Sequence, residues 1–232
     1  MLLTDLADAC RKSGLPVVEE VGWRTRGHGH FAGLMGIVCH HTATPAAAPG
    51  DYPSLRIVRD GRSDLPGPLS QLGLGRDGTV YVIAAGVAWH AGATSLPRQD
   101  NWHTIGIEAE HDGVSRWAPE QYAAYASLAA TLAEHYGIPL SNVEGHKEVA
   151  TPRGRKIDPN FDMDAFRGVV KQMRDARTQP DPRDAVRPDL NAAMKHTKAA
   201  DALVKGRPRL KFAIGKMRYW TRRARRINRG DK

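Results

Sequence analysis

Hydrophobic and polar positions predict four strands in the first half of the chain. The segment 104–110 alternates apolar residues with polar or small ones, which is the period of a half-buried strand. The run 34–39 is almost wholly apolar and leads into His40 and His41, as expected of a buried strand that ends at one of them. Segments 69–74 and 79–84 flank a Gly-Arg-Asp-Gly sequence. Because Asp-Gly supplies the positive φ angles of a tight turn, these two segments are predicted to form a hairpin.

Spacings of three and four residues predict helices between and after these strands. The longest spans 119–136, with proline in its first turn and glycine after its last. Its apolar positions form one stripe, made of Tyr122, Tyr125, Leu128, Ala129, Leu132 and Tyr136. Shorter helices are expected at 4–13, with Thr4 as N-cap, at 52–59 and at 163–174. Strands and helices without a regular alternation predict an α/β (α+β) fold with a central mixed sheet flanked by helices.

Composition divides the chain into three predicted parts. Residues 1–175 contain all of these elements and are expected to form the main domain, with the first helix as an N-terminal extension. Prolines recur among polar residues at 176–188, which is typical of a linker. Residues 189–232 are expected to form a small helical module, with helices at 190–204 and 210–227.

The formal net charge of +9 is concentrated in the last part of the chain. From Pro180 to Lys232 there are 16 Lys and Arg against 5 Asp and Glu, a balance of +11. The remaining residues carry 18 basic and 20 acidic side chains, a balance of −2. The two regions are therefore expected to have different partners.

The region 207–229 carries ten Lys or Arg residues and no acidic residue. Six apolar residues recur in it at helical spacing, namely Leu210, Ile214, Met217, Trp220, Ala224 and Ile227. A cationic helix with Trp on its apolar face is typical of segments that bind an anionic membrane or an acidic envelope polymer. Equally, this helix could pack on the helix at 190–204 and leave its basic face in solvent. Nucleic-acid binding is disfavoured, because no base-reading motif accompanies the charge.

The two cysteines and the N-terminal residues indicate the cellular compartment in which the chain is made. Cys10 and Cys39 imply no disulfide framework. Cys39 is interpreted as a small buried hydrophobe, because adjacent strand residues such as Cys39 and His40 face opposite sides. No run of about 18 or more apolar residues occurs, so a membrane span is not expected. The start lacks the basic and long apolar regions of a signal peptide, so we expect synthesis in the cytoplasm without export by that route.

Three separated motifs contain side chains that could bind one metal ion. His40 follows the apolar run, His146 lies in Gly-His-Lys-Glu, and Asp158 lies in Arg-Lys-Ile-Asp-Pro. Two imidazoles and a carboxylate would give a divalent metal three protein ligands and leave one coordination position open. That is the ligand count of a catalytic zinc site, so a metal-assisted hydrolase is the leading hypothesis.

Six motifs, in this order along the chain, resemble those of the zinc-dependent N-acetylmuramoyl-L-alanine amidases, which share a fold with peptidoglycan recognition proteins. They are Ile-Val-Cys-His-His-Thr-Ala-Thr at 37–44, Gly-Arg-Asp-Gly-Thr-Val-Tyr at 75–81, Trp-His-Ala-Gly at 89–92, Ile-Gly-Ile-Glu at 105–108, Gly-His-Lys-Glu-Val-Ala at 145–150 and Arg-Lys-Ile-Asp-Pro at 155–159. The motif sequences are most similar to those of the amidase modules of phage endolysins that attack actinobacterial hosts. The resemblance implies that residues 1–175 are a zinc amidase catalytic domain of this fold.

The resemblance implies a set of ligands for Zn²⁺. Carried over by motif, His40 is the first ligand, His146 the second and Asp158 the third. Bound Zn²⁺ would lower the pKa of a water molecule to about 7 and polarise the amide carbonyl that joins muramic acid to L-alanine. His41 is expected to pack elsewhere, because alternation along the strand sends it to the other face. Asp158, which precedes a proline, could instead begin a turn.

The same resemblance implies catalytic roles for two further residues. Glu108 is the candidate for orienting the attacking water or shuttling its proton, and Glu110 on the same face is its substitute. Lys156 is expected to stabilise the tetrahedral oxyanion. Several relatives place a tyrosine before the Arg-Asp-Gly turn, where this chain has none. Either Glu108 then carries more of the proton transfer, or Gln71 supplies a weaker hydrogen bond.

Trp89 and His90 resemble positions that line the substrate groove of the family. A sugar or stem peptide could stack on Trp89 or bond to His90, although Trp89 could equally belong to the core. The Arg-Asp-Gly sequence that begins at Arg76 is interpreted as a turn and not as a catalytic element.

Together these inferences predict a monomeric peptidoglycan hydrolase that cleaves the bond between N-acetylmuramic acid and L-alanine, as a phage endolysin. It would reach the wall after a membrane lesion in an infected host, with its basic helices at the envelope. Two alternatives remain open. One is a module that binds muropeptides without cutting them, and the other is a cytoplasmic amidase that recycles soluble muropeptides.

Overall fold

The computed structural model describes residues 1–178, of which Met1–Arg174 form one compact unit. Its helices are α1 (Leu6–Arg11), α2 (Leu55–Asp60), α3 (Pro119–His135), α4 (His146–Val149) and α5 (Met163–Thr178), with 3-10 turns at Pro97–Gln99 and Leu140–Asn142. Its strands are β1 (Val17–Glu19), β2 (Gly36–His41), β3 (Gly61–Arg62), β4 (Leu65–Pro66), β5 (Leu72–Leu74), β6 (Val80–Val82), β7 (Thr104–Ala109) and β8 (Val143–Gly145). Within the described residues, no helix has the length and apolar character needed to cross a membrane.

The predicted basic module lies outside the described residues, as does most of the predicted linker. The proposed division into three parts therefore stays a prediction. Helix α5 continues through Thr178, past the expected start of the linker at residue 176.

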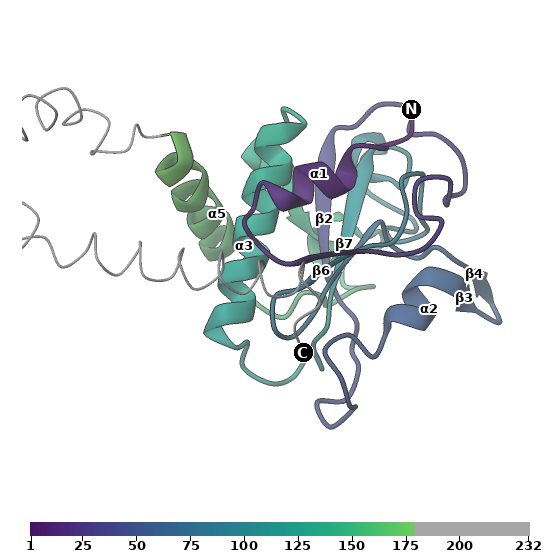
Figure 1. The fold of residues 1–232 in the computed structure, drawn as a ribbon, viewed down its shortest axis with the longest axis horizontal. Coiled ribbons are helices and arrows are strands. Elements are labelled where there is room, and N and C mark those ends of the chain that lie inside the picture. The colour runs from purple at the N-terminus through teal and green to yellow at the C-terminus, as the bar shows by residue number, and fades with distance from the viewer. Residues whose placement is uncertain (179–232) are drawn as a thin grey trace, which may run out of the picture. The chain divides into compact units, whose positions relative to one another are not determined.

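Six strands form one mixed sheet in the order β1-β6-β5-β7-β2-β8. Strands β5 and β6 are the predicted antiparallel hairpin, and all other neighbours in this sheet are parallel. The register of β2 and β7 places His40 beside Glu108. Helices α3 and α2 lie toward opposite sides of these strands (Figure 1). The predicted fold class, a central mixed sheet flanked by helices, is confirmed.

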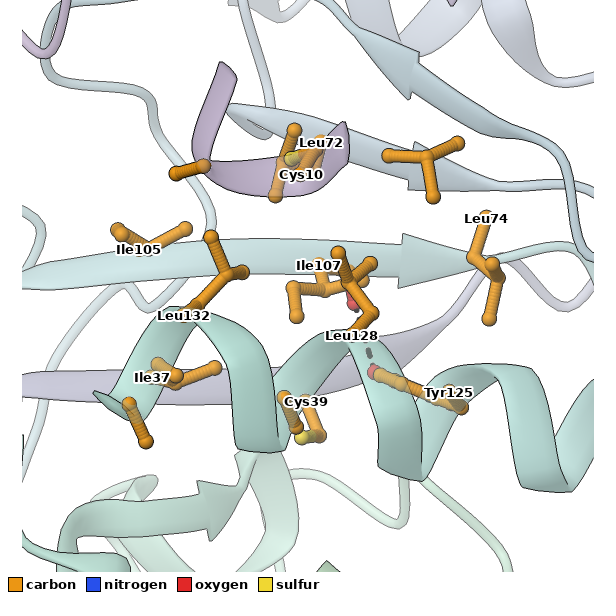
Figure 2. Close-up of a cluster of buried hydrophobic side chains, with 14 of the residues drawn as sticks. Cys10, Ile37, Cys39, Leu72, Leu74, Ile105, Ile107, Tyr125, Leu128 and Leu132 are labelled. Atoms are coloured by element: carbon orange, nitrogen blue, oxygen red, sulfur yellow. Dashed lines mark hydrogen bonds between the residues drawn. The ribbon is translucent and has the colours of Figure 1, made fainter. Parts of the chain in front are cut away.

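One face of the central strands packs against α3 to form the main core. Figure 2 shows this layer, in which the following labelled side chains are fully buried: Ile37, Cys39, Ile105, Ile107, Leu128 and Leu132. Burying each large aliphatic side chain contributes on the order of 1.5–3 kcal/mol, so this layer is a principal source of stability. Burial also raises the pKa of the Cys39 thiol to about 12, which agrees with its predicted role as an unreactive small hydrophobe.

The opposite face of the central strands is covered by loops that lie directly on the backbone. A Cβ atom at Gly106 would stand 2.6 Å from Cγ of His90, and one at Gly73 would stand 2.4 Å from the ring of Tyr52. Tyr52 also donates its hydroxyl hydrogen bond to the carbonyl oxygen of Glu108 at 3.0 Å. Glycine in β5 and β7 therefore makes room for the aromatic residues that surround the candidate site.

Local element boundaries show what the pattern could and could not resolve. Helix α1 has Asp5 as its N-cap, so the prediction of Thr4 is wrong. The carbonyl oxygen of Asp5 accepts the first intrahelical hydrogen bond, from the N–H of Ala9 at 2.9 Å, which makes Asp5 the capping position. Strands β1 and β8 were not predicted, because three residues carry too few positions to display a period of two.

Candidate metal centre

Three side chains predicted to bind a metal converge at the carboxyl end of β2. The Nδ1 atoms of His40 and His146 lie 3.0 Å apart, and Oδ2 of Asp158 lies 3.1 Å from each of them. All three residues are buried. Among the described residues, this is the one group of three His, Cys, Asp or Glu side chains whose ligand atoms come close enough to hold a metal ion.

Separate elements bring these donors together. His40 is the fifth residue of β2, and His146 is the first residue of α4, directly after β8. Because β8 pairs with β2 in parallel, the two histidines emerge at the same edge of the sheet. Asp158 lies in the loop before α5, and its carbonyl oxygen accepts a hydrogen bond from the N–H of Lys147 at 2.7 Å. That bond ties the Asp158 loop to the start of α4.

Hydrogen bonds behind the two histidines determine which ring nitrogens face the centre. The carbonyl oxygen of Thr104 can only accept, so Nε2 of His90, 3.1 Å away, carries a proton and Nδ1 of His90 is an acceptor. Nε2 of His40 lies 3.2 Å from that acceptor and therefore donates to it. Likewise, Nε2 of His146 donates to the carbonyl oxygen of Ala91 at 3.0 Å. In their neutral forms, both metal-facing histidines present an unprotonated Nδ1.

Three hydrogen-bond acceptors thus meet with no donor between them. Burial, and then the charge of His146, lowers the pKa of His40 to about 4, so this imidazole is neutral near pH 7. Two lone pairs and a carboxylate at 3.0–3.1 Å repel one another unless a cation lies among them. The donor set therefore fits a divalent metal ion.

Glu108 and Glu110 extend from the same strand region but have different surroundings. Oε1 of Glu108 lies 3.9 Å from Nδ1 of His40, and its Oε2 is buried without a hydrogen-bond partner in the described part of the chain. Burial, and then the charge of Asp158, raises the pKa of Glu108 to about 8. Glu110 instead accepts three hydrogen bonds, from Thr42 Oγ1, Ser54 Oγ and Ser54 N. Of the two carboxylates, Glu108 is the one with an oxygen free beside the centre.

The other predicted site residues lie around this centre. Lys156 is half-buried. Burial is the largest cause of the shifted pKa of both His40 and Glu108, and the positive charge of Lys156 lowers both pKa values by a smaller amount. His90 contacts His40 directly, as described above, and its own pKa is lowered well below the ordinary value by burial. Trp89 is half-buried and stacks on His28 with ring centroids 4.3 Å apart. The structure thus brings His90 into contact with a metal-facing residue, while Trp89 belongs to a neighbouring aromatic cluster.

His41 is excluded from the three-donor group although it adjoins His40. Its ring is buried, its Nδ1 has no hydrogen-bond partner in the described residues, and its centroid lies 6.1 Å from that of His111. This arrangement agrees with the prediction that only one of the two adjacent histidines faces the metal-binding side, because neighbouring strand residues point to opposite faces.

Gln71 is fully buried, and both its amide oxygen and its amide nitrogen make hydrogen bonds to the backbone. Its Oε1 accepts from the N–H of Gly106 at 2.7 Å, and its Nε2 donates to the carbonyl oxygen of Gly86 at 3.2 Å. These bonds give Gln71 a structural role, and the alternative in which it replaces the family tyrosine stays a prediction. The sequence could not reveal these bonds, because both partners come from other segments.

Two supporting residues were not predicted from the sequence. The hydroxyl of Tyr125 accepts a hydrogen bond from the N–H of His40 at 2.9 Å and donates to the carbonyl oxygen of Ile107 at 2.8 Å. Oδ1 of Asn101 accepts from the N–H groups of His90 and Ala91 at 3.0 and 2.8 Å. Tyr125 could have been found, since a tyrosine in the apolar stripe of a helix needs a buried partner for its hydroxyl. No comparable signal marks Asn101.

The Arg-Asp-Gly sequence forms a turn that anchors the loop after β2. The guanidinium of Arg76 donates to the carbonyl oxygens of Pro45, Ala48 and Gly50 at 2.5–3.2 Å. Oδ1 of Asp51 accepts from the N–H of Asp77 at 2.7 Å. The sequence predicted the turn, whereas these bonds to the segment that follows His40 and His41 were not predicted.

Fold and donor set together define a mixed α/β protein with three side chains that could hold a metal ion on the loop-covered face of its sheet. The chain belongs to the N-acetylmuramoyl-L-alanine amidase family, because the family model Amidase_2 (N-acetylmuramoyl-L-alanine amidase) matches residues 31–161, more than half of the chain. The matched segment includes all three metal-facing residues.

Individual relatives agree with this assignment. The 1,6-anhydro-N-acetylmuramyl-L-alanine amidase AmpD of Citrobacter freundii is 33% identical over 99 residues, which are 41% of this chain and 53% of AmpD. The chain thus spans about half the length of the curated relatives it matches. The crystal structure of a selenomethionine AmpD derivative is 24% identical, with a TM-score of 0.51, over 68% of this chain and 94% of that one. The N-acetylmuramoyl-L-alanine amidase LysC from Clostridium intestinale URNW is 21% identical, with a TM-score of 0.51, over 67% of this chain and 97% of LysC. At these identities, the two structures establish the shared fold.

Proposed function

We propose that this protein is a zinc-dependent peptidoglycan hydrolase that cleaves the amide bond between N-acetylmuramic acid and the L-alanine of the stem peptide. The observation that carries the proposal is the convergence of His40, His146 and Asp158, with Glu108 beside them, in a member of the amidase family. Two nitrogen donors and one oxygen donor suit zinc. When bound, zinc would supply the Lewis acidity that activates water and polarises the amide carbonyl.

In this proposal, the chain's own residues orient the reactants and move the proton. Glu108 accepts the proton of the attacking water on a carboxylate oxygen and returns it to the nitrogen of the departing alanine. Burial raises the pKa of Glu108 to about 8 in the metal-free protein. A bound cation would lower this pKa toward neutral pH, where a group can both take up and release a proton. Lys156 provides a fixed positive charge for the oxyanion that develops on the carbonyl oxygen. His90 and the carbonyl oxygen of Ala91 hold the two metal-facing imidazoles in orientation.

The decisive assay measures new N-terminal alanine when the purified protein digests intact diaminopimelate-type peptidoglycan. We expect alanine termini that disappear with a zinc chelator and return with added zinc. His146→Ala should lose both bound zinc and activity, whereas His30→Ala, which removes an exposed histidine, should lose neither. Full activity in His146→Ala would overturn the metal assignment. Wild-type protein that sediments with the wall but releases no alanine would indicate the alternative binding module.

We further propose that the protein acts as a phage endolysin on the cell wall of an infected host, as a monomer. Support comes from the sequence resemblance and from the +11 balance between Pro180 and Lys232, which suits an anionic membrane or envelope polymer. The rival is a cytoplasmic recycling amidase, and the curated relatives named 1,6-anhydro-N-acetylmuramyl-L-alanine amidase favour it. The two differ in substrate, so the ratio of kcat/KM on intact sacculi to that on soluble anhydro-muropeptides decides between them.

A further inference from the structure

Three aromatic side chains form a continuous cluster near the metal centre. His28 and Trp89 stack at 4.3 Å with their planes inclined by 10°, and Trp102 meets Trp89 at 5.3 Å and 60°. We name His28, Trp89 and Trp102 the aromatic platform. Trp102 is 43% exposed, although burial of so large an apolar side chain would stabilise the fold. Its exposed surface is therefore available to a ligand.

The turn that carries Trp102 is held by hydrogen bonds. Oδ1 of Asp100 accepts from the N–H of Trp102 at 2.8 Å and contacts Nδ1 of His103 at 2.7 Å. The carbonyl oxygen of Asp100 accepts from the hydroxyl of Thr104 at 2.7 Å. Because the turn is already ordered, little conformational freedom is lost when a ligand contacts the indole.

The same turn fixes the platform relative to the metal centre. Asn101, directly before Trp102, accepts hydrogen bonds from the N–H groups of His90 and Ala91. These two residues in turn bind the outer ring nitrogens of His40 and His146. One short segment therefore connects the exposed indole to the residues that orient two of the three candidate metal donors.

We propose that Trp102, with Trp89 and His28 behind it, binds a sugar of the glycan strand next to the muramic acid whose amide is cut. The inference rests on the proposed function. In that function the reacting amide is attached to a muramic acid residue, which has further sugars on both sides in the polymer. The apolar C–H face of a pyranose ring can stack on an indole while its hydroxyl groups stay in water. The three rings of the platform include no carboxylate or ammonium group that would pair with a charged stem peptide. Trp102 would then favour polymeric peptidoglycan over soluble fragments with a single sugar.

The test compares Trp102→Ala with the wild type on two substrates, polymeric peptidoglycan and a soluble N-acetylmuramoyl-L-alanyl peptide with one sugar. We expect KM on the polymer to rise about tenfold in the variant, equivalent to about 1.4 kcal/mol, with kcat unchanged. Both constants on the one-sugar substrate should stay at the wild-type level. Trp102→Tyr, which keeps a flat aromatic face, should recover most of the affinity for the polymer. Val21→Ala is the matched control, because Val21 is an apolar side chain that is 92% exposed in a different turn.

Equal losses on both substrates would overturn the proposal, since they would mean that Trp102 only supports the centre. No loss on the polymer would overturn it as well, and so would weaker inhibition by free stem peptide in Trp102→Ala, which would identify a peptide as the occupant. Direct titration of peptide-free glycan strands separates this proposal from the hydrolase proposal. If the wild type releases no alanine, the hydrolase proposal fails. Weaker glycan binding by Trp102→Ala than by the wild type would still support the platform, and equal binding would refute it.

Discussion

The two faces of the central sheet are built by the same strands but differ in what they need. In β2, Cys39 enters the closed apolar layer against α3, whereas the next residue, His40, enters the metal centre. The apolar layer is complete without any ligand (Figure 2). The metal centre instead gathers three acceptors that repel one another. Alternation of side chains along one strand therefore separates the residues that stabilise the fold from those that form the candidate site.

The two faces meet at the backbone of β2 and β7. The hydroxyl of Tyr125, which belongs to a core helix, binds the backbone N–H of His40 and the carbonyl oxygen of Ile107. The core thus holds the strand that carries the first metal donor, while the donor atom itself is free to bind the metal.

The largest effect is expected where the repulsion at the centre is removed. Asp158→Asn replaces a carboxylate by an amide whose NH₂ group can donate to the Nδ1 atom of His40 or His146. The metal-free variant should therefore be at least as stable as the metal-free wild type. Activity should fall at least about a thousandfold, because loss of the metal removes several kcal/mol of transition-state stabilisation. Zinc should raise the Tm of the wild type but not of the variant. An equal zinc-dependent rise in both proteins would contradict this account.

A second contrast separates the two carboxylates next to the centre. Glu108→Gln should lower kcat by about 10²–10⁴-fold, the usual contribution of a general acid or base, and leave the Tm unchanged or higher. Glu110→Gln should cost roughly 1–3 kcal/mol of stability. Its new NH₂ group would face N–H and O–H groups that donate to the carboxylate in the wild type, so at least one of these donors would lose its acceptor. Below its Tm, this second variant should keep its activity. Paired measurements of kcat and thermal unfolding decide the matter, and the reverse pattern would exchange the roles of the two residues.

The sequence predicted the members of the centre better than their surroundings. His40, His146 and Asp158 could be proposed because each lies in a short motif whose residue types suit a metal. Glu108 was preferred to Glu110, but alternation alone places both on one face, and the partners that occupy Glu110 come from a distant loop.

Supporting contacts were hidden for a similar reason. The roles of Gln71 and Asn101 depend on backbone groups brought near them only by folding. A single exposed residue such as Trp102 has no periodicity to mark it. The fold class was predictable from the hairpin, the alternating strand and the long helix, whereas three-residue strands such as β1 and β8 were too short to show a pattern.

A third prediction tests the apolar face. Leu128→Ala, in the layer shown in Figure 2, should cost about 2–5 kcal/mol of unfolding free energy, because it leaves a cavity beneath the sheet. The folded variant should bind zinc with wild-type stoichiometry, since Leu128 belongs to the apolar layer and the hydrogen bond between Tyr125 and His40 is kept. Urea unfolding with and without zinc measures both quantities. Loss of zinc binding by the folded variant would show that the two faces are not separable.

The last prediction concerns the pH dependence of the metal-free protein. The folded pKa of Glu108, about 8, lies above its ordinary value of 4.5, so between these values the folded state binds more protons than the unfolded state. The free energy of unfolding should therefore fall as the pH rises from 4.5 to 8, by at most about 1.4 kcal/mol per unit from this group. Since 18% of the side chain is exposed, solvent should reduce that slope.

Glu108→Gln removes this titration without removing a hydrogen bond that the carboxylate oxygens make among the described residues. Relative to the wild type, its stability should therefore increase as the pH rises through the same window. Urea unfolding in the presence of a chelator, at several pH values, measures the two profiles. Zinc should flatten the wild-type profile, because a nearby cation favours the ionised carboxylate. Parallel profiles of the two metal-free proteins would mean that Glu108 is ionised throughout, and that the loop-covered face tolerates a buried charge without its metal.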